Sequence, residues 1–128
     1  MSEEKIENRI IEKKRWFEFL DRFSRQHKNW LVTVGVTESS GAQTVFAENA
    51  RLNNIYEAKG EIAVAIEPPP SHDSRKITPI HIGSPHKIIL RQVDDRTHKG
   101  LTIESDHGTR LHLEFRSTKP PEMVNGKI

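Results

Sequence analysis

The sequence predicts an α+β protein, in which an N-terminal amphipathic helix is followed by an antiparallel meander that closes into a small SH3-like or Sm-like β-barrel. Three observations predict this fold. Apolar residues recur at helical spacing near the N-terminus and at every second position after residue 30. The apolar runs after residue 30 are separated by a few residues only, too few for the crossovers that join parallel strands. The length of 128 residues fits one domain.

The helix is expected from about Glu12 to His27. Four apolar residues in this segment follow the i, i+3, i+4, i+7 rule and form one stripe: Trp16, Phe19, Leu20 and Phe23. The opposite face is charged, so the stripe is expected to pack against the barrel. Residues 1–9 are charged and show no periodicity, so we expect a flexible N-terminal tail there.

Alternation of apolar and other residues begins at Trp30 and predicts short strands separated by turns that are rich in Gly, Pro, Ser and Asp. The expected strands cover residues 30–36, 43–48, 55–58, 61–67, 77–82, 87–93, 101–105 and 109–116. A single domain is therefore expected at residues 10–116. Residues 117–128 contain little apolar content, and we expect them to form a disordered C-terminal tail.

The composition excludes several classes of protein. The chain has no cysteine, which excludes disulfides, Cys-ligated zinc and thiol catalysis. It carries 20 Lys and Arg against 18 Asp and Glu, and the small positive excess lies in residues 1–30, with eight basic and six acidic side chains. No apolar stretch approaches the ~20 residues of a membrane helix. Met1–Lys5 carries no apolar signal region, so we expect no membrane contact and a cytoplasmic location.

The leading functional hypothesis is a non-enzymatic module that binds a protein partner or self-associates. The strand expected at residues 109–116 contains no proline and no inward charge that would protect a sheet edge. Its outward side chains alternate in charge and form the candidate interaction surface: Arg110, His112, Glu114 and Arg116. Such a strand favours antiparallel pairing with a second copy, so a homodimer through the C-terminal hairpin is expected.

The first alternative is an Sm-like protein that binds single-stranded RNA. Ile80-His81-Ile82-Gly83, followed by Ile88, is similar to the isoleucine–glycine strand motif that lines the RNA pore of such proteins. Pro85 and the wider spacing depart from that motif. The candidate RNA contacts combine one aromatic ring with basic side chains: Tyr56, His81, Lys87 and Arg91.

The second alternative is a histidine-based metal protein or a small enzyme. His81 and His86 flank a tight turn, and His72 or His112 could complete a zinc site. However, the sequence has no H-E-x-x-H spacing, no G-x-S-x-G elbow and no phosphate-binding glycine loop. We therefore expect no metal, no cofactor and no enzymatic activity.

One run of the sequence resembles the opening of a family of small bacterial proteins that is catalogued only as a domain of unknown function. The run extends from Trp16 to Val34 and reads W-x-x-F-L-x-x-F-S-x-x-H-x-x-W-L-V-x-V. Later features, such as Ala42-Gln43 and Ile80-x-Ile82-x-x-Pro85, are also similar. The resemblance covers roughly residues 10–116 and implies a bacterial source and a compact domain. It implies no activity.

Overall fold

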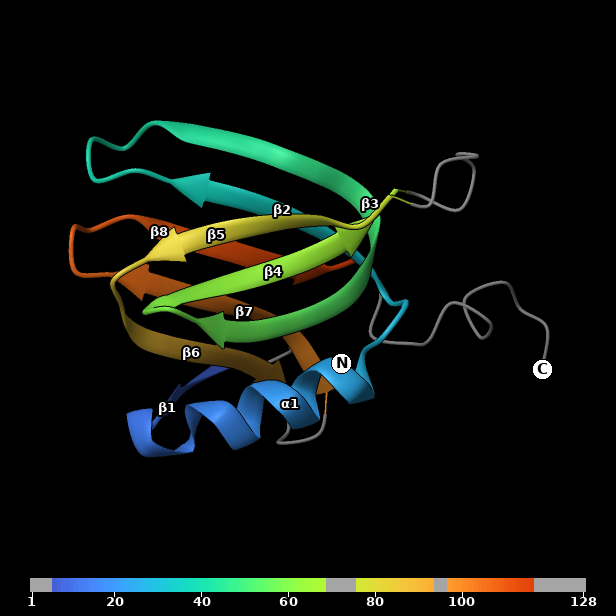
Figure 1. The fold of residues 1–128 in the computed structure, drawn as a ribbon, viewed down its shortest axis with the longest axis horizontal. Coiled ribbons are helices and arrows are strands. Elements are labelled where there is room, and N and C mark those ends of the chain that lie inside the picture. Colours follow the sequence, from blue (N-terminus) through green and yellow to red (C-terminus); the bar gives the residue numbers. More distant parts are fainter. Residues whose placement is uncertain (1–5, 69–75, 94–96, 117–128) are drawn as a thin grey trace, which may run out of the picture.

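The protein forms one eight-stranded antiparallel sheet with a single short helix (Figure 1). The structure is a computed structural model that describes residues 6–68, 76–93 and 97–116. The elements in chain order are β1 (Ile6–Ile11), a 3-10 turn (Lys13–Arg15), α1 (Trp16–Gln26), β2 (Leu31–Thr37), β3 (Gln43–Ala58), β4 (Glu61–Glu67), β5 (Thr78–Gly83), β6 (Pro85–Val93), β7 (Thr97–Ser105) and β8 (Arg110–Phe115).

The sheet is open, so the predicted closed SH3-like or Sm-like barrel is wrong. The strand order is β1-β6-β7-β8-β2-β3-β4-β5, which leaves β1 and β5 at the two edges. Only Ser84 separates β5 from β6. The φ of Ser84 is 48°, and the chain bends there from the edge strand β5 into β6, which lies near the opposite end of the strand order. Pro79 in β5 has no N–H to donate, which is tolerated at a sheet edge. The result is a curled sheet whose edges do not pair.

The predicted order of a helix followed by strands is also wrong, because the described chain begins with a strand. Residues 6–9, expected in a flexible tail, belong to β1, which pairs with β6 in an unbroken register. Residues 6–10 are all exposed, so β1 has no buried face to give a period-two signal. The predicted tail at residues 117–128 lies outside the described residues.

Strand β3 is one long strand where the sequence indicated two short ones. Residues 43–51 pair with β2 and residues 51–58 pair with β4. Asn49, with a φ of 55°, and register shifts on both ladders mark the point where the strand turns from one neighbour to the other. The irregular pattern at residues 49–54 therefore marks a bend within a strand.

The helix packs through the stripe that the sequence predicts. Trp16, Leu20 and Phe23 are buried in the core, whereas their neighbour Phe17 is 80% exposed. The indole Nε1 of Trp16 donates a hydrogen bond to the carbonyl oxygen of Ile11 over 2.9 Å. Figure 1 shows α1 running beneath the curled sheet, so its apolar face completes the core from one side.

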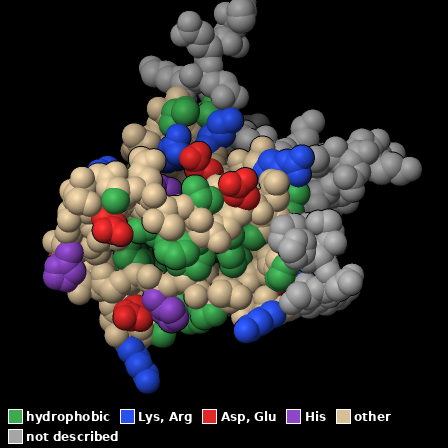
Figure 2. Space-filling view, turned by 90° about the horizontal axis from the view of Figure 1, so that it is seen from above, with side chains coloured by type: hydrophobic (Ala, Val, Ile, Leu, Met, Phe, Trp, Pro, Cys, Tyr) green, Lys and Arg blue, Asp and Glu red, His purple; other side chains and the backbone are tan. Residues whose placement is uncertain are grey.

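Hydrophobic side chains are exposed on the side of the molecule that lies opposite the helix (Figure 2). Figure 2 shows hydrophobic side chains gathered at the centre of this side, with acidic and histidine side chains around them. No helix in the described ranges has the length and apolar character needed to cross a membrane.

Candidate functional site

The predicted interaction surface on β8 exists as one face, but β8 is not an edge. The side chains of Arg110, Glu114 and Arg116 are exposed, and that of His112 is half-buried. The alternate residues Leu111 and Leu113 are buried. On one side β8 pairs with β2, and on the other it pairs with β7. Because both ladders are occupied, the edge on which the expected C-terminal homodimer depended does not exist.

The half-buried His112 is held within this face by two neighbouring hydroxyl groups. Its Nε2 lies 3.2 Å from Oγ1 of Thr37 and its Nδ1 lies 3.3 Å from Oγ1 of Thr102. Burial, and then the charge of Arg110, lower the pKa of His112 below its ordinary value. The ring therefore links three adjacent strands and presents no free nitrogen to a partner.

The four predicted RNA contacts do not form one cluster. Tyr56 and His81 share a face, because each lies opposite Ala63 of β4 in the ladder. His81 Nδ1 is 3.2 Å from Glu61 Oε1. The two candidate contacts on β6 also have acidic neighbours. Lys87 lies opposite Glu104 in the ladder, and Arg91 is 3.9 Å from Glu114. Three of the four contacts thus have a carboxylate beside them, which disfavours RNA phosphates at these positions.

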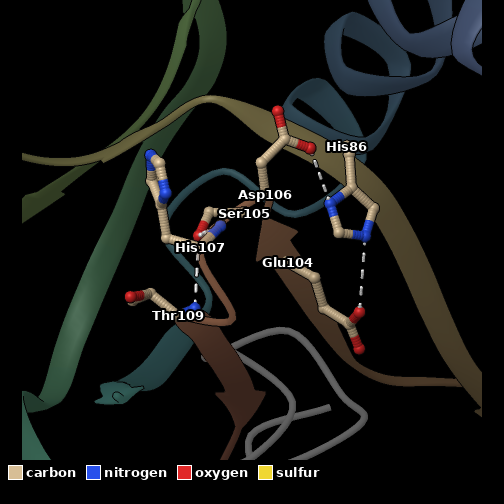
Figure 3. Close-up of polar contacts among 6 residues, drawn as sticks. All are labelled: His86, Glu104, Ser105, Asp106, His107 and Thr109. Atoms are coloured by element: carbon tan, nitrogen blue, oxygen red, sulfur yellow. Dashed lines mark hydrogen bonds and ion pairs between the residues drawn. The ribbon is translucent and has the colours of Figure 1, made fainter. Parts of the chain in front are cut away.

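The two histidines of the alternative zinc site have different carboxylate partners. His81 faces Glu61, whereas His86 lies between two carboxylates contributed by β7 and the turn that follows it (Figure 3). His72 is outside the described residues. Within the described ranges, no group of three or more His, Asp or Glu side chains is arranged to hold a metal ion. The absence of bound zinc stays a prediction, which elemental analysis would check.

The His86 cluster fastens the β5–β6 bend to the β7–β8 turn. His86 Nδ1 lies 3.0 Å from Asp106 Oδ1, and its Nε2 lies 3.8 Å from Glu104 Oε1 (Figure 3). The backbone N–H of Asp106 donates to the carbonyl of Ser84 over 2.8 Å. Ser105 is buried, and its Oγ accepts backbone hydrogen bonds from the turn. With both imidazole nitrogens facing carboxylates and the serine buried, the arrangement supports the turn and offers no nucleophile–base pair.

A different feature, which the sequence did not reveal, is a cup beside the helix with a cavity volume of about 230 Å³. Three arginines line it, and they come from three separate elements: Arg9 from β1, Arg15 from the 3-10 turn and Arg22 from α1. The apolar lining is formed by Phe19, Phe23 and Leu90, and the remaining lining residues are Glu18, Gln26 and His98. We call this feature the arginine cup.

The arginine cup carries a surplus of positive charge. Within the described ranges, none of its three guanidinium groups forms an ion pair, whereas Arg25, Arg51 and Arg91 each do. Glu18 is the single acidic residue among those that line the cup. Burial, and then the nearby charge of Arg9, lower the pKa of His98 below its ordinary value. The only sequence signal for this site was the positive excess in residues 1–30.

Beneath the cup, His98 is hydrogen-bonded to the buried His27. Nδ1 of His27 is 2.8 Å from the carbonyl oxygen of Phe23, which can only accept, so this nitrogen carries a hydrogen. In the neutral ring Nε2 of His27 is then an acceptor, and Nδ1 of His98 donates to it over 3.1 Å. Burial lowers the pKa of His27 to about 4, with the neighbouring His98 acting in the same direction and the Phe23 carbonyl opposing.

The fold and the site together define a small single-sheet protein: an open, curled antiparallel sheet with one helix beneath it and a basic cup beside that helix. The chain belongs to a family of unknown function (DUF5335), whose family model matches residues 7–123. This match confirms the resemblance to a family of unknown function. No curated protein and no solved structure matches the chain.

Proposed function

We propose that the protein is a non-enzymatic binding module that holds a small anionic molecule in the arginine cup. The observation that carries this proposal is the convergence of Arg9, Arg15 and Arg22 on one cavity, with no ion pair to any of them in the described ranges. A guanidinium group offers a planar fork of N–H donors that matches carboxylate and phosphate oxygens. Three guanidinium groups would supply the positive charge that attracts an anion and the N–H donors that orient it.

The lining of the cup also indicates what is attached to the anionic group. Phe19, Phe23 and Leu90 give the cavity an apolar wall. The volume of about 230 Å³ lies below the range of roughly 300–1,000 Å³ that is typical of drug-sized ligands. The proposed ligand is therefore a small molecule with a phosphate or carboxylate group and a compact apolar or aromatic body.

Binding without catalysis is proposed because of the chemistry of the lining. The residues around the cup include no hydroxyl or thiol group that could act as a nucleophile. Nδ1 of His98 is engaged by His27. These features support binding of an anion without its chemical conversion. A cytoplasmic location is also part of the proposal.

Calorimetric titration with simple probes tests the proposed function. Phenyl phosphate and benzoate carry an anionic group on an aromatic ring, and benzyl alcohol is the neutral comparison. We expect both anions to bind and the alcohol not to bind, with affinity that falls as salt is raised, because exposed charges are screened. Binding of neither anion at about 10 mM probe and low salt would overturn the proposal.

Two matched variants test whether the anion binds in the arginine cup. Arg22→Gln removes one guanidinium group of the cup, and Arg110→Gln makes the same change on the exposed face of β8. We expect at least a tenfold loss of anion affinity for the first and none for the second. Equal losses in both variants would indicate general charge attraction and would contradict a specific site.

A further inference from the structure

Self-association through a strand edge does not require the anion site proposed above. The stretches of the described sheet that have a free side include β1, β5 and residues 43–48 of β3. Free strand edges can pair with another chain unless proline, a bulge or twist protects them. β5 carries Pro79, and the first part of β3 contains a register shift, so both of these edges carry such protection.

Strand β1 has no proline and no bulge, and its two charged residues, Glu7 and Arg9, have opposite signs. All six residues pair with β6 without a register shift, and the segment has neither proline nor glycine. It also exposes two large apolar side chains, Ile6 at 46% and Ile10 at 61%. Since alternate residues of a strand share a face, these two isoleucines lie on one face with Asn8 between them. In the β1–β6 ladder Ile10 lies opposite Ile89, which extends the apolar strip onto β6.

The sequence of β1 is complementary to itself in the antiparallel direction. If two copies pair about Asn8, Glu7 of each copy lies opposite Arg9 of the other, and Ile6 of each lies opposite Ile10 of the other. Opposite charges and apolar pairs in directly opposed positions both stabilise a ladder. The two ion pairs lie on one face of the new ladder and the four isoleucines lie on the other.

We propose that the occupant of the β1 edge is a second copy of this chain, which pairs antiparallel with β1 about Asn8 to form a two-fold symmetric dimer with one continuous sheet. A two-fold axis requires the same surface on both copies, and β1 meets this requirement through its own sequence. Arg9 has five N–H donors, so it can face the partner's Glu7 and still line the arginine cup. The interface is small, so the dimer is expected to be weak and concentration-dependent.

Sedimentation equilibrium over about 1 to 500 µM protein tests this proposal at several salt concentrations. We expect a monomer–dimer equilibrium that shifts toward monomer when salt is raised, because the two ion pairs are exposed. A chain that stays monomeric at the highest protein concentration and low salt would overturn the proposal. An assembly larger than a dimer would do the same, because the paired edge is used up in the dimer.

Substitutions test whether β1 is the strand edge at which the two copies pair. Ile10→Lys should raise the dimer dissociation constant at least tenfold, whereas Ile77→Lys, at another isoleucine that is 49% exposed, should leave it unchanged. A dimer that persists in Ile10→Lys would place the interface elsewhere. Circular dichroism reports whether the variants fold, and Glu7→Gln, at an exposed position, gives the same readout if Ile10→Lys does not fold.

Exchanging the charges of Glu7 and Arg9 tests the register in which the two β1 strands pair. Glu7→Arg alone and Arg9→Glu alone each place like charges opposite one another in the proposed ladder, so each should weaken the dimer. The double variant restores opposite charges and should recover the dissociation constant to within about threefold. Failure of the double variant to recover would exclude pairing about Asn8.

Discussion

His27 and His98 form a hydrogen-bonded pair with 3.1 Å between Nε2 of His27 and Nδ1 of His98. The pair joins the packed interior to the arginine cup, since His27 is buried and His98 lines the cup. In this arrangement His27 is neutral, and its protonation would require His98 to change tautomer, because otherwise both facing nitrogens would carry a hydrogen. The pair is therefore sensitive to acid.

The first prediction is that acid destabilises the protein through His27. Its pKa is about 4 when folded, against an ordinary value of 6.5. Between these two pH values the unfolded chain binds more protons than the folded one, so the free energy of unfolding falls as pH is lowered and levels off near pH 4. From pH 7 to pH 5 the loss from this group is about 2 kcal/mol. Urea denaturation at the two pH values measures it.

A His27→Gln variant should show a smaller difference in stability between pH 7 and pH 5 than the unaltered protein. His107→Gln, at an exposed residue of the β7–β8 turn, serves as the control and should keep the full difference. An undiminished pH dependence in His27→Gln would contradict the role of the buried ring.

The second prediction concerns adjacent aromatic residues of α1. Trp16 is 2% exposed and Phe17 is 80% exposed. Trp16→Ala removes a core side chain and should cost roughly 3–5 kcal/mol of unfolding free energy. Phe17→Ala should change it by less than about 0.5 kcal/mol, the range typical of surface substitutions. Thermal and urea denaturation of both variants would check this contrast, and similar melting temperatures would show that the helix is not part of the core.

The third prediction uses the close approach of β7 to β8 at Gly100. A Cβ added there would overlap the carbonyl oxygen of Leu113, a backbone atom that cannot move away alone. At Gly83 the nearest atom to an added Cβ is a flexible carboxylate oxygen 3.8 Å away. Gly100→Ala should therefore destabilise the protein by about 1–3 kcal/mol or more, as overpacking does. Gly83→Ala should be tolerated, and equal chemical-denaturation midpoints for the two variants would refute the argument.

The fourth prediction concerns the polar link between α1 and β3. Oγ of Ser24 is buried, accepts a hydrogen bond from the backbone N–H of Ile55 over 2.8 Å and lies 3.2 Å from its carbonyl oxygen. The side chain of Asn54 also accepts from that N–H. Ser24→Ala should cost about 1–2 kcal/mol. Because the two acceptors serve one donor, Ser24→Ala combined with Asn54→Ala should cost more than the sum of the single variants. Additive losses in urea denaturation would argue against a shared donor.

Local pattern was sufficient to predict α1 and β4. The stripe of Trp16, Leu20 and Phe23 predicted the buried face of the helix, and alternation predicted β4 at residues 61–67. The helix has one buried face, which recurs at helical spacing, whereas residues 62–66 of β4 are all buried and alternate larger with smaller apolar side chains. The turn at Gly83–Pro85 was also anticipated, although its effect on closure of the sheet was not.

The remaining features depend on contacts between distant residues. Residues 6–10 of β1 are exposed, so this strand carries no periodic signal. The central place of β8 depends on its pairing with β2, some eighty residues earlier, and short-range patterns carry no information about such a partner. The arginine cup combines three elements whose arginines are neighbours only after folding. For this reason the candidate site was missed, while the buried stripe of the helix was predicted.

The position of β8 between β7 and β2 has a consequence for the order of events during synthesis. Until residues 110–115 have left the ribosome, β8 cannot pair with β2 and β7, and the remaining ladders of the native sheet join the strands in two separate groups, β1-β6-β7 and β2-β3-β4-β5. During translation the nascent chain would expose the facing sides of β2 and β7. The chain therefore acquires its native sheet after translation of its last described strand, and not gradually from the N-terminus.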